Sequence, residues 1–499
     1  MLDQCNASNF AYWPSKNAEF TWRTSNQRYI TFEPDHNGWN NHRMAFENAV
    51  ALAYALNRTL VLPPKHHIHH LRGSDHSVDE WFQMSALKSQ IEVISIDDLL
   101  QETPIFAQVL PPGSVTEHVR GVKATGNITE LVKYLRAVGY FPGWRWPTHC
   151  LLIEDAAPGC HGMNASELSV QEESFCNGRA PIRASSAAFA NQPLLHFPYE
   201  LVGKDEREWK RLSAGHFYTF LRFRKPHQQA TFLRFMRDNV RYQDTIVCAA
   251  AAVVRALRKE AGGSFSTLHI RRGNFGLPGT PSDERCAQRD AARETTKERR
   301  AFAERLAHAV ASVLHTNEML YIATDEVRPN FFKPLVARGF RLRFQRHVRE
   351  VLLPYAGALG GKHAWHFHGA VEQLVAAQGR TFHGTLRSTF SGYVVRLRGY
   401  LNGSTAALHT RWLPCLRQSA AFVEEGWPSP PFWGAEWPLA WRISENDIDL
   451  SRQLLGEGQR KTGRRVSQVI KAEVAQRNCG RNCITLDCVN SCSKDENVA

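Results

Sequence analysis

Two adjacent arginines lie just after an apolar stretch in the middle of the chain. The apolar stretch, residues 266–270, has the composition of a β-strand, and Arg271, Arg272 and Gly273 follow it. Ligands of α/β proteins bind beyond the carboxyl ends of strands. A guanidinium offers planar donors that suit a phosphate, and a glycine lets the backbone come close to it. The pattern therefore predicts either a diphosphate site or an ordinary basic strand end that faces solvent.

A second polar loop follows an apolar stretch near the start of the chain. Residues 29–33 are a candidate strand, residues 42–56 have the apolar spacing of a helix, and residues 59–62 form a strand that two prolines end. This order predicts a βαβ unit. One asparagine of the loop could cap the helix, but two adjacent amides and an arginine exceed what a cap needs, so a ligand role is equally open. The loop residues concerned are Gly38, Trp39, Asn40, Asn41 and Arg43.

A third loop, after the candidate strand at residues 380–383, is rich in hydroxyl groups, and a helix is expected at residues 393–400. Hydroxyls and free backbone N–H groups at a helix N-terminus can bind an anion. A cap cluster of Ser and Thr is the alternative, but it leaves Arg387, Arg396 and Arg398 without an explanation. The hydroxyl and aromatic residues of this loop are Ser388, Thr389, Phe390 and Ser391.

The three loops share one design, in which a strand is followed by a polar loop and then a helix. Such a repeat predicts an α/β fold, and strands 266–270, 320–324 and 380–383 should be parallel. We expect an irregular lead-in, a first half with an insertion rich in Cys, Gly and Pro at residues 141–193, a second half, and a Trp- and Pro-rich segment with a basic tail. The corresponding boundaries are residues 1–28, 29–240, 241–405 and 406–499.

Together, these segments resemble the GDP-fucose protein O-fucosyltransferase family. Four ordered motifs carry the resemblance, which covers about residues 28–402. They are Gly38 to Met44, His269 to Asn274, Tyr321 to Glu326, and Glu372 with Ser388 to Ser391. The resemblance implies a GT-B-like fold, in which two Rossmann-like domains face a cleft, and a reaction that requires no metal or other cofactor.

The resemblance also implies an inverting glycosyltransferase that moves fucose from GDP-fucose to a hydroxyl acceptor, either Ser/Thr of a protein or a glycan. Arg271 would bridge the diphosphate and stabilise charge on the leaving group, and His269 would contact the same phosphates or the ribose. Glu372 would accept hydrogen bonds from guanine. Asn40 would reach the sugar or phosphate from the first half, as a second catalytic residue. The other residues expected to bind the donor are Gly38, Trp39, Arg43, Ser388, Thr389 and Phe390.

Two residues depart from the family pattern. Asn274 stands where the family usually has Asp, and Asn37 stands where one branch has a Glu that acts as general base. An amide carries no charge and takes no proton at neutral pH, so the base would be Asp35, His36 or no side chain at all. A GDP-sugar or glycan-binding protein without catalysis is therefore the alternative function.

Composition and charge agree with a large globular protein. The chain has 499 residues, of which 43% are hydrophobic, and a formal net charge of +13, so two or three domains are expected. Positive charge suits phosphates, acidic substrates or nucleic acid. No nucleic-acid-binding motif accompanies the basic clusters at residues 338–349 and 460–465, so no nucleic-acid partner is expected. No apolar run of roughly 18 residues is present, which predicts no membrane span.

Cysteines and glycosylation sequons favour a secretory setting, in the ER or Golgi lumen. The chain contains eleven cysteines. Asn-x-Ser/Thr sequons occur at Asn6, Asn57, Asn127, Asn164 and Asn402. No signal sequence is recognisable at the start, so we expect the signal or anchor to be absent from this chain, with a cytosolic protein as the alternative.

Some cysteine and histidine groups could form disulfides or bind a metal. Cys150, Cys160 and Cys176 flank a Gly- and Pro-containing region that suits disulfides. The histidines at residues 66–70 follow two prolines and predict a turn rather than a metal site. Four tail cysteines have a spacing that is unusual for zinc, so two disulfides are favoured there, with the pairing open. They are Cys479, Cys483, Cys488 and Cys492.

Overall fold

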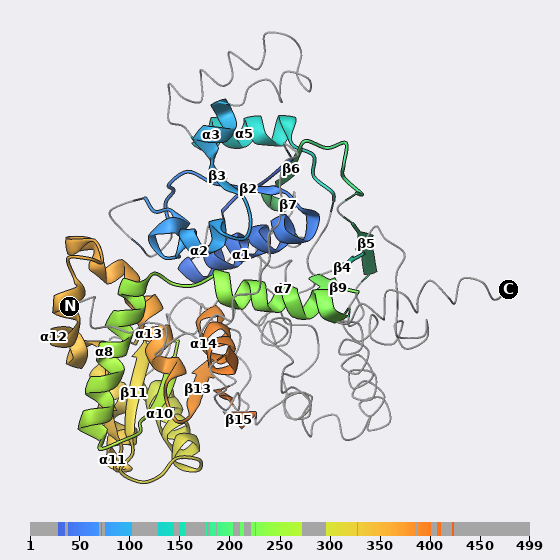
Figure 1. Cartoon of the computed structure of the whole chain (residues 1–499). Coiled ribbons are helices and arrows are strands. Elements are labelled where there is room, and N and C mark those ends of the chain that lie inside the picture. Colours follow the sequence, from blue (N-terminus) through green and yellow to red (C-terminus); the bar gives the residue numbers. More distant parts are fainter. Residues whose placement is uncertain are drawn as a thin grey trace, which may run out of the picture.

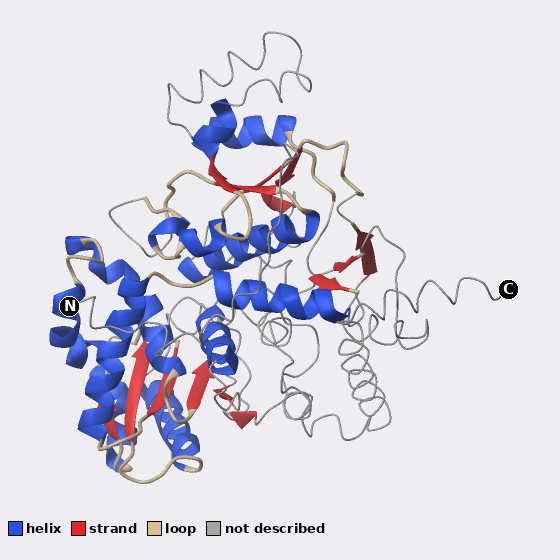
Figure 2. Ribbon diagram, viewed as in Figure 1, coloured by secondary structure: helices blue, strands red, loops and turns tan. Residues whose placement is uncertain are grey.

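Two halves, each built on a mainly parallel β-sheet, make up the described part of the chain (Figure 1). The computed structural model describes residues 28–34, 38–68, 71, 75–101, 128–143, 149–154, 176, 180–185, 187–202, 210–213, 221–224, 226–271, 296–326, 328–385, 388–400, 407–410 and 422–423. Helices cover both main sheets (Figure 2), so the predicted α/β class is confirmed. Among the described helices, none is both long and apolar enough to cross a bilayer.

The main sheet of the first half has four parallel strands in the order β3-β2-β1-β6. Its strands are β1 (Tyr29–Phe32), β2 (Thr59–Leu62), β3 (Val93–Ser95) and β6 (Leu194–Phe197). Side chains alternate between the two faces of a strand. Ile30 and Phe32 therefore pack with α1 (Trp39–Leu56), whereas Tyr29 packs in a separate cluster with α3 (Ile96–Gln101) and α5 (Ile128–Val138). The sheet is buried on both faces, as parallel sheets require.

Helix α1 begins earlier than the sequence predicts. Its cap is Gly38, whose extended backbone lets the carbonyl accept the N–H groups of Asn41 and His42. Asn40 and Asn41 thus lie in the first turn, and the prediction that one of them caps the helix is wrong. The helix ends at Asn57, which adopts the left-handed conformation and donates its N–H back to the last turn.

Smaller elements complete the first half. The expected insertion supplies two strands of a parallel three-stranded sheet in the order β5-β4-β9, and a disulfide joins Cys150 to Cys176 beside it. The remaining elements are α2 (Met84–Lys88), β4 (His149–Ile153), β5 (Ala180–Ala184), the hairpin β7 (Tyr199–Val202) and β8 (Lys210–Ser213), β9 (Leu221–Phe223), α7 (Pro226–Asn239) and a 3-10 helix at Val78–Glu80.

The second half has a six-stranded sheet in the order β12-β11-β10-β13-β14-β15, with only β15 antiparallel. Its first five strands follow a Rossmann order, and the predicted parallel pairing of β10, β11 and β13 is confirmed. The sheet continues past residue 405, where the sequence places the end of this half, because β14 pairs with β13. The strands are β10 (Ser266–Ile270), β11 (Met319–Thr324), β12 (Arg341–Arg343), β13 (Phe382–Thr385), β14 (Ala407–Thr410) and β15 (Phe422–Val423).

Three helices of the second half form a layer that also packs against α1. They are α8 (Asp244–Ala261), α13 (His368–Ala377) and α14 (Thr389–Tyr400), and one apolar cluster includes residues from them and from α1. Helices α10 (Thr296–Ala311) and α11 (Lys333–Ala337) cover the opposite face of the sheet. The other elements are α12 (Arg349–Leu352) and 3-10 helices at Pro329–Phe332, Gln345–Val348, Leu353–Tyr355 and Gly361–Phe367.

Candidate functional site

His269 is the second-last residue of β10, and its side chain lies on the face of the sheet that packs against α14. Its ring is buried, bonds through Nδ1 to the hydroxyl of Ser391 at 2.8 Å, and stacks on Phe390 with ring centres 4.3 Å apart. Burial, helped by the nearby charge of Arg271, lowers the pKa of His269 to about 3. The imidazole is therefore neutral, and it holds the start of α14 against β10 rather than offering positive charge to a phosphate.

Arg271 lies one residue beyond β10 and is tied to the end of β13. Its backbone N–H donates to Oγ1 of Thr385 at 2.9 Å, and the same hydroxyl donates to the carbonyl of His269 at 2.9 Å. Burial lowers the pKa of Arg271, while Asp325 opposes the change, and a guanidinium stays charged at neutral pH in either case. The structure thus brings together the exits of two neighbouring strands and one charged arginine.

The N-terminus of α14 completes this exit. The helix begins at Thr389, four residues before the sequence predicts, so Thr389, Phe390 and Ser391 form its first turn. Ser388 precedes it, and its buried Oγ makes no hydrogen bond with any part of the described chain. Backbone N–H groups in the first turn of a helix lack intrahelical acceptors, so this end can bind an anion.

Glu372 lies on α13 and is held by a residue that the sequence analysis did not assign a role. The hydroxyl of Tyr321, from β11, donates to Oε1 of Glu372 at 3.1 Å. Burial raises the pKa of Glu372 to about 7, although the hydrogen bond from Tyr321 acts in the opposite direction. Tyr321 is the first residue of the third family motif, and this position could have marked it as a candidate site residue.

Asn40 reaches the second half through one hydrogen bond. Nε2 of Gln373, a fully buried neighbour of Glu372, donates to Oδ1 of Asn40 at 2.8 Å. Oε1 of Gln373 in turn accepts from the hydroxyl of Tyr242 at 2.8 Å. Neither Gln373 nor Tyr242 stands out in the sequence, because the contact depends on how the two halves pack.

Arg43 belongs to a different cluster from Arg271. Its Nε donates to Glu47 at 2.9 Å, and one terminal nitrogen donates to the hydroxyl of Tyr242 at 2.6 Å. Arg396 of α14 binds both oxygens of Glu47, at 2.7 and 2.9 Å, and the hydroxyl of Tyr393 also donates to this carboxylate. Burial acts to raise the pKa of Glu47, but Arg396 and Arg43 hold it below its ordinary value.

This buried cluster contradicts the sequence argument for two of its three arginines, Arg396 and Arg398. The arginines after the third loop are not left over for an anion, because Arg396 binds Glu47 and Arg398 donates to backbone carbonyls at the end of α13. The guanidinium of Arg43 is likewise committed to Glu47 and Tyr242. Trp39 is partly buried and stacks on Trp81 with ring centres 4.0 Å apart, against the apolar core of the first half.

Several predicted site residues lie outside the described residues. They are Asp35, His36, Asn37, Arg272, Gly273, Asn274 and Arg387. The identity of the general base and the effects of Asn37 and Asn274 therefore stay predictions. The same holds for the tail cysteines, which are Cys479, Cys483, Cys488 and Cys492.

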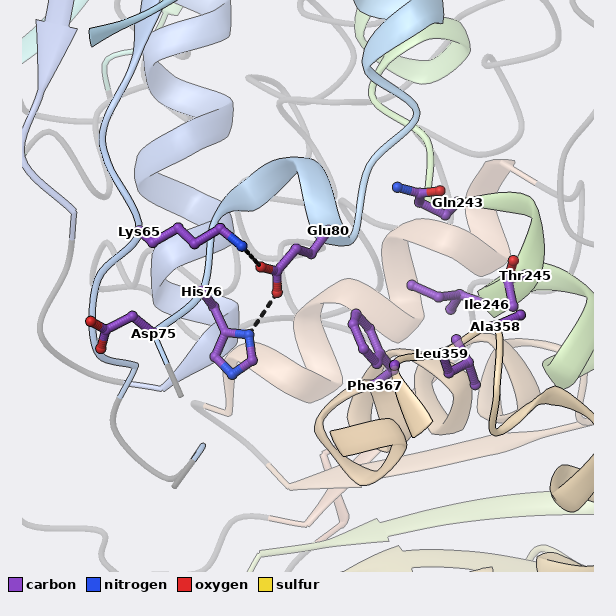
Figure 3. A pocket seen from close by; sticks show the side chains of 11 residues that line it. Lys65, Asp75, His76, Glu80, Gln243, Thr245, Ile246, Ala358, Leu359 and Phe367 are labelled. Carbon is purple, nitrogen blue, oxygen red and sulfur yellow. Dashed lines mark hydrogen bonds and ion pairs between the residues drawn. The ribbon is translucent and has the colours of Figure 1, made fainter. Parts of the chain in front are cut away.

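A cavity of about 400 Å³ lies between the halves and was not predicted (Figure 3). Glu80 lies on one side of it and bonds to Lys65 at 3.0 Å and to Nδ1 of His76 at 2.7 Å. Phe367 and Leu359 of the second half line the other side. None of the expected donor-binding residues lines this cavity, and in the described chain no group of three or more His, Cys, Asp or Glu is placed to hold a metal.

The fold and the strand exits together define a class of protein. Two Rossmann-like halves, with an arginine and a helix N-terminus gathered at the carboxyl ends of β10 and β13, form a GT-B-like glycosyltransferase fold. The family model for GDP-fucose protein O-fucosyltransferase matches residues 29–401, and the chain belongs to that family.

Solved structures of fucosyltransferases are similar at low identity. POFUT1 in complex with GDP-fucose is 14% identical, with a TM-score of 0.37, over 78% of this chain and 99% of that chain. NodZ alpha-1,6-fucosyltransferase soaked with GDP-fucose is 12% identical, with a TM-score of 0.35, over 80% of this chain and 98% of that chain. Fucosyltransferase NodZ from Bradyrhizobium is 12% identical, with a TM-score of 0.33, over 74% and 92%. No curated protein matches the chain significantly.

Proposed function

We propose that this protein is an inverting fucosyltransferase that moves fucose from GDP-fucose to a hydroxyl group of a protein or a glycan. Membership of the family supports GDP-fucose as the sugar donor. The observation that carries the proposal is the joined exit of β10 and β13, where Arg271 and the first turn of α14 lie together. This arrangement suits a diphosphate, and Glu372 on the adjacent helix suits the N–H edge of guanine.

In the proposed reaction, the acceptor oxygen attacks the anomeric carbon of fucose from the face opposite GDP. The bond between that carbon and the β-phosphate oxygen breaks, and GDP departs with the electron pair. Arg271 and the N-terminus of α14 would stabilise the growing charge on the phosphate, so the reaction needs no metal ion. The acceptor proton would pass to Asp35, to His36 or to water, and Asn40 would contact the sugar or the phosphate from the first half.

Donor screening tests this proposal. GDP and GDP-fucose should raise the melting temperature of the purified protein, whereas UDP should not. Incubation with GDP-fucose and candidate acceptors should then release GDP and add the mass of one fucose to the acceptor. Equal stabilisation by UDP would sink the guanine assignment, and GDP-fucose binding without transfer or hydrolysis would favour the non-catalytic alternative that Asn37 and Asn274 suggest.

We also propose that the protein works in the lumen of the ER or Golgi. The Cys150–Cys176 disulfide and the five sequons support this compartment. Peptide mapping of protein isolated from its source should find this disulfide or occupied sequons. Free thiols at every cysteine together with unmodified sequons would favour the cytosol instead.

A further inference from the structure

A directed chain of hydrogen bonds runs from Arg43 to Asn40. A terminal nitrogen of Arg43 donates to the hydroxyl of Tyr242 at 2.6 Å. That hydroxyl donates to Oε1 of Gln373 at 2.8 Å, and Nε2 of Gln373 donates to Oδ1 of Asn40 at 2.8 Å. The chain leaves α1, passes through the segment between the halves and through α13, and returns to the first turn of α1.

The chemistry of its first member fixes the direction of every later bond. A guanidinium has no acceptor, so the oxygen of Tyr242 must accept from Arg43 and has its own proton left for Gln373. Gln373 must receive that proton on Oε1, which turns its NH₂ group toward Asn40. Asn40 must then accept on Oδ1, and its NH₂ group points away from Gln373 as a donor.

Two observations keep this direction from reversing. Burial raises the pKa of Tyr242 above its ordinary value, so the hydroxyl keeps its proton, although the charge of Arg43 acts in the opposite direction. Arg43 is itself held by Glu47, which also binds Arg396. An isolated amide can rotate by half a turn at little cost, but Gln373 is fully buried, and its rotation would take the acceptor away from the Tyr242 proton and set Oε1 of Gln373 against Oδ1 of Asn40.

We propose that Tyr242 and Gln373 are positioning residues that hold the Asn40 amide with its NH₂ group toward GDP-fucose. There the NH₂ group donates a hydrogen bond to a diphosphate oxygen or to the oxygen that departs with GDP when its bond to fucose breaks. This inference rests on the proposed function. A hydrogen-bond donor that is already oriented stabilises negative charge without reorganising during the reaction. An amide with no fixed orientation would present either its NH₂ group or its oxygen.

A double-mutant cycle tests the relay. Tyr242→Phe removes the hydroxyl, and Asn40→Ala removes the amide on which it is proposed to act. Calorimetric titration with GDP and steady-state kinetics with GDP-fucose are measured for both variants and for the double variant. We expect Tyr242→Phe to weaken GDP binding by about tenfold, the scale of one hydrogen bond to a charged group. In the Asn40→Ala background, the same change should alter binding by less than about twofold.

Two further variants guard against a general effect on folding. Gln373→Leu interrupts the relay without touching Arg43 and should show the same coupling to Asn40→Ala. Tyr134→Phe is the matched control, because Tyr134 is a buried tyrosine in the cluster on the opposite face of the first sheet. Its effect, whatever its size, should be the same with and without Asn40.

The outcomes separate the relay from the donor assignment. Equal weakening by Tyr242→Phe in both backgrounds would overturn the relay and leave GDP-fucose as the donor. Failure of the unmodified protein to bind GDP would overturn the proposed function and the relay with it. Loss of the Tyr242→Phe effect in the absence of the Asn40 amide supports the relay, because a purely structural effect would persist there.

Discussion

Burial decides which of the candidate side chains can meet charge on a phosphate. His269 is neutral because burial lowers its pKa, and the Arg43 guanidinium donates hydrogen bonds to Glu47 and Tyr242. Among the residues that the structure describes at the exit of β10, Arg271 carries the positive charge. Residue type and spacing placed all three residues in one site, because they do not reveal which side chains become buried or where the partners of each side chain lie.

Arg271→Ala should lower kcat for fucosyl transfer by roughly 100-fold or more, the scale seen when one preorganised donor to a developing charge is removed. Arg271→Lys should recover only part of the rate, because an ammonium lacks the planar fork of donors. Arg305→Ala, on the exposed side of α10, is the control and should be near normal. Near-normal transfer by a folded Arg271→Ala protein would contradict the mechanism.

The pKa of Glu372 predicts a pH dependence of donor binding. Burial raises this pKa to about 7, and only the carboxylate form accepts two hydrogen bonds from guanine. Glu372 is mostly ionised at pH 8 and mostly protonated at pH 6, so affinity for GDP should fall by about tenfold between them. Calorimetric titrations across this range measure the fall.

Glu372→Gln separates this effect from the titration of GDP itself. The variant should bind GDP weakly and should show only the pH dependence that the phosphate contributes. Identical pH profiles for the variant and the unmodified protein would rule out a titrating contact between Glu372 and guanine.

At the scale of elements, several strands of the two main sheets were predictable, but the starts of α1 and α14 were not. The strands at residues 266–270 and 59–62 are rich in apolar and β-branched residues, and this local composition predicts a strand without knowledge of the tertiary packing. The start of α14 was missed because Ser and Thr favour caps and turns in isolation. In the folded protein, Ser391 bonds to His269, and this tertiary contact extends the helix by one turn.

Ser391→Ala tests the importance of that contact for α14. It should lower the free energy of unfolding by about 1–3 kcal/mol, because the buried Nδ1 of His269 loses its partner. It should also weaken GDP binding, since the first turn of α14 loses its anchor. Ser312→Ala, near the end of α10, removes a local bond to Ala309 and serves as the comparison in urea denaturation. Unchanged stability and GDP affinity would show that α14 is positioned by other contacts.

For the molecule as a whole, the contacts that join the two halves could not be predicted from the sequence. Glu47 and Arg396 have ordinary helical neighbours, and nothing in their local pattern marks them as partners. Their pairing follows from how α1 packs against α14. The family resemblance supplied the two-domain arrangement, but the charged contacts that join the domains of this chain came only from its structure.

Glu47→Ala should lower the free energy of unfolding by about 3–5 kcal/mol, because it leaves Arg43 and Arg396 as buried, unneutralised cations. Glu304→Ala, which breaks the surface pair with Arg338, should change it by less than about 1 kcal/mol. Chemical denaturation of both variants measures the difference. Equal effects would mean that solvent reaches the buried cluster.

The partners of Glu47 are made at very different times during synthesis. Arg43 is one helical turn away, but Tyr393 and Arg396 lie 346 and 349 residues further along the chain. While the ribosome is still producing the second half, α1 holds a carboxylate that lacks most of its final neighbours. The first half therefore cannot reach its finished core until α14 has emerged, and contacts at this separation form slowly.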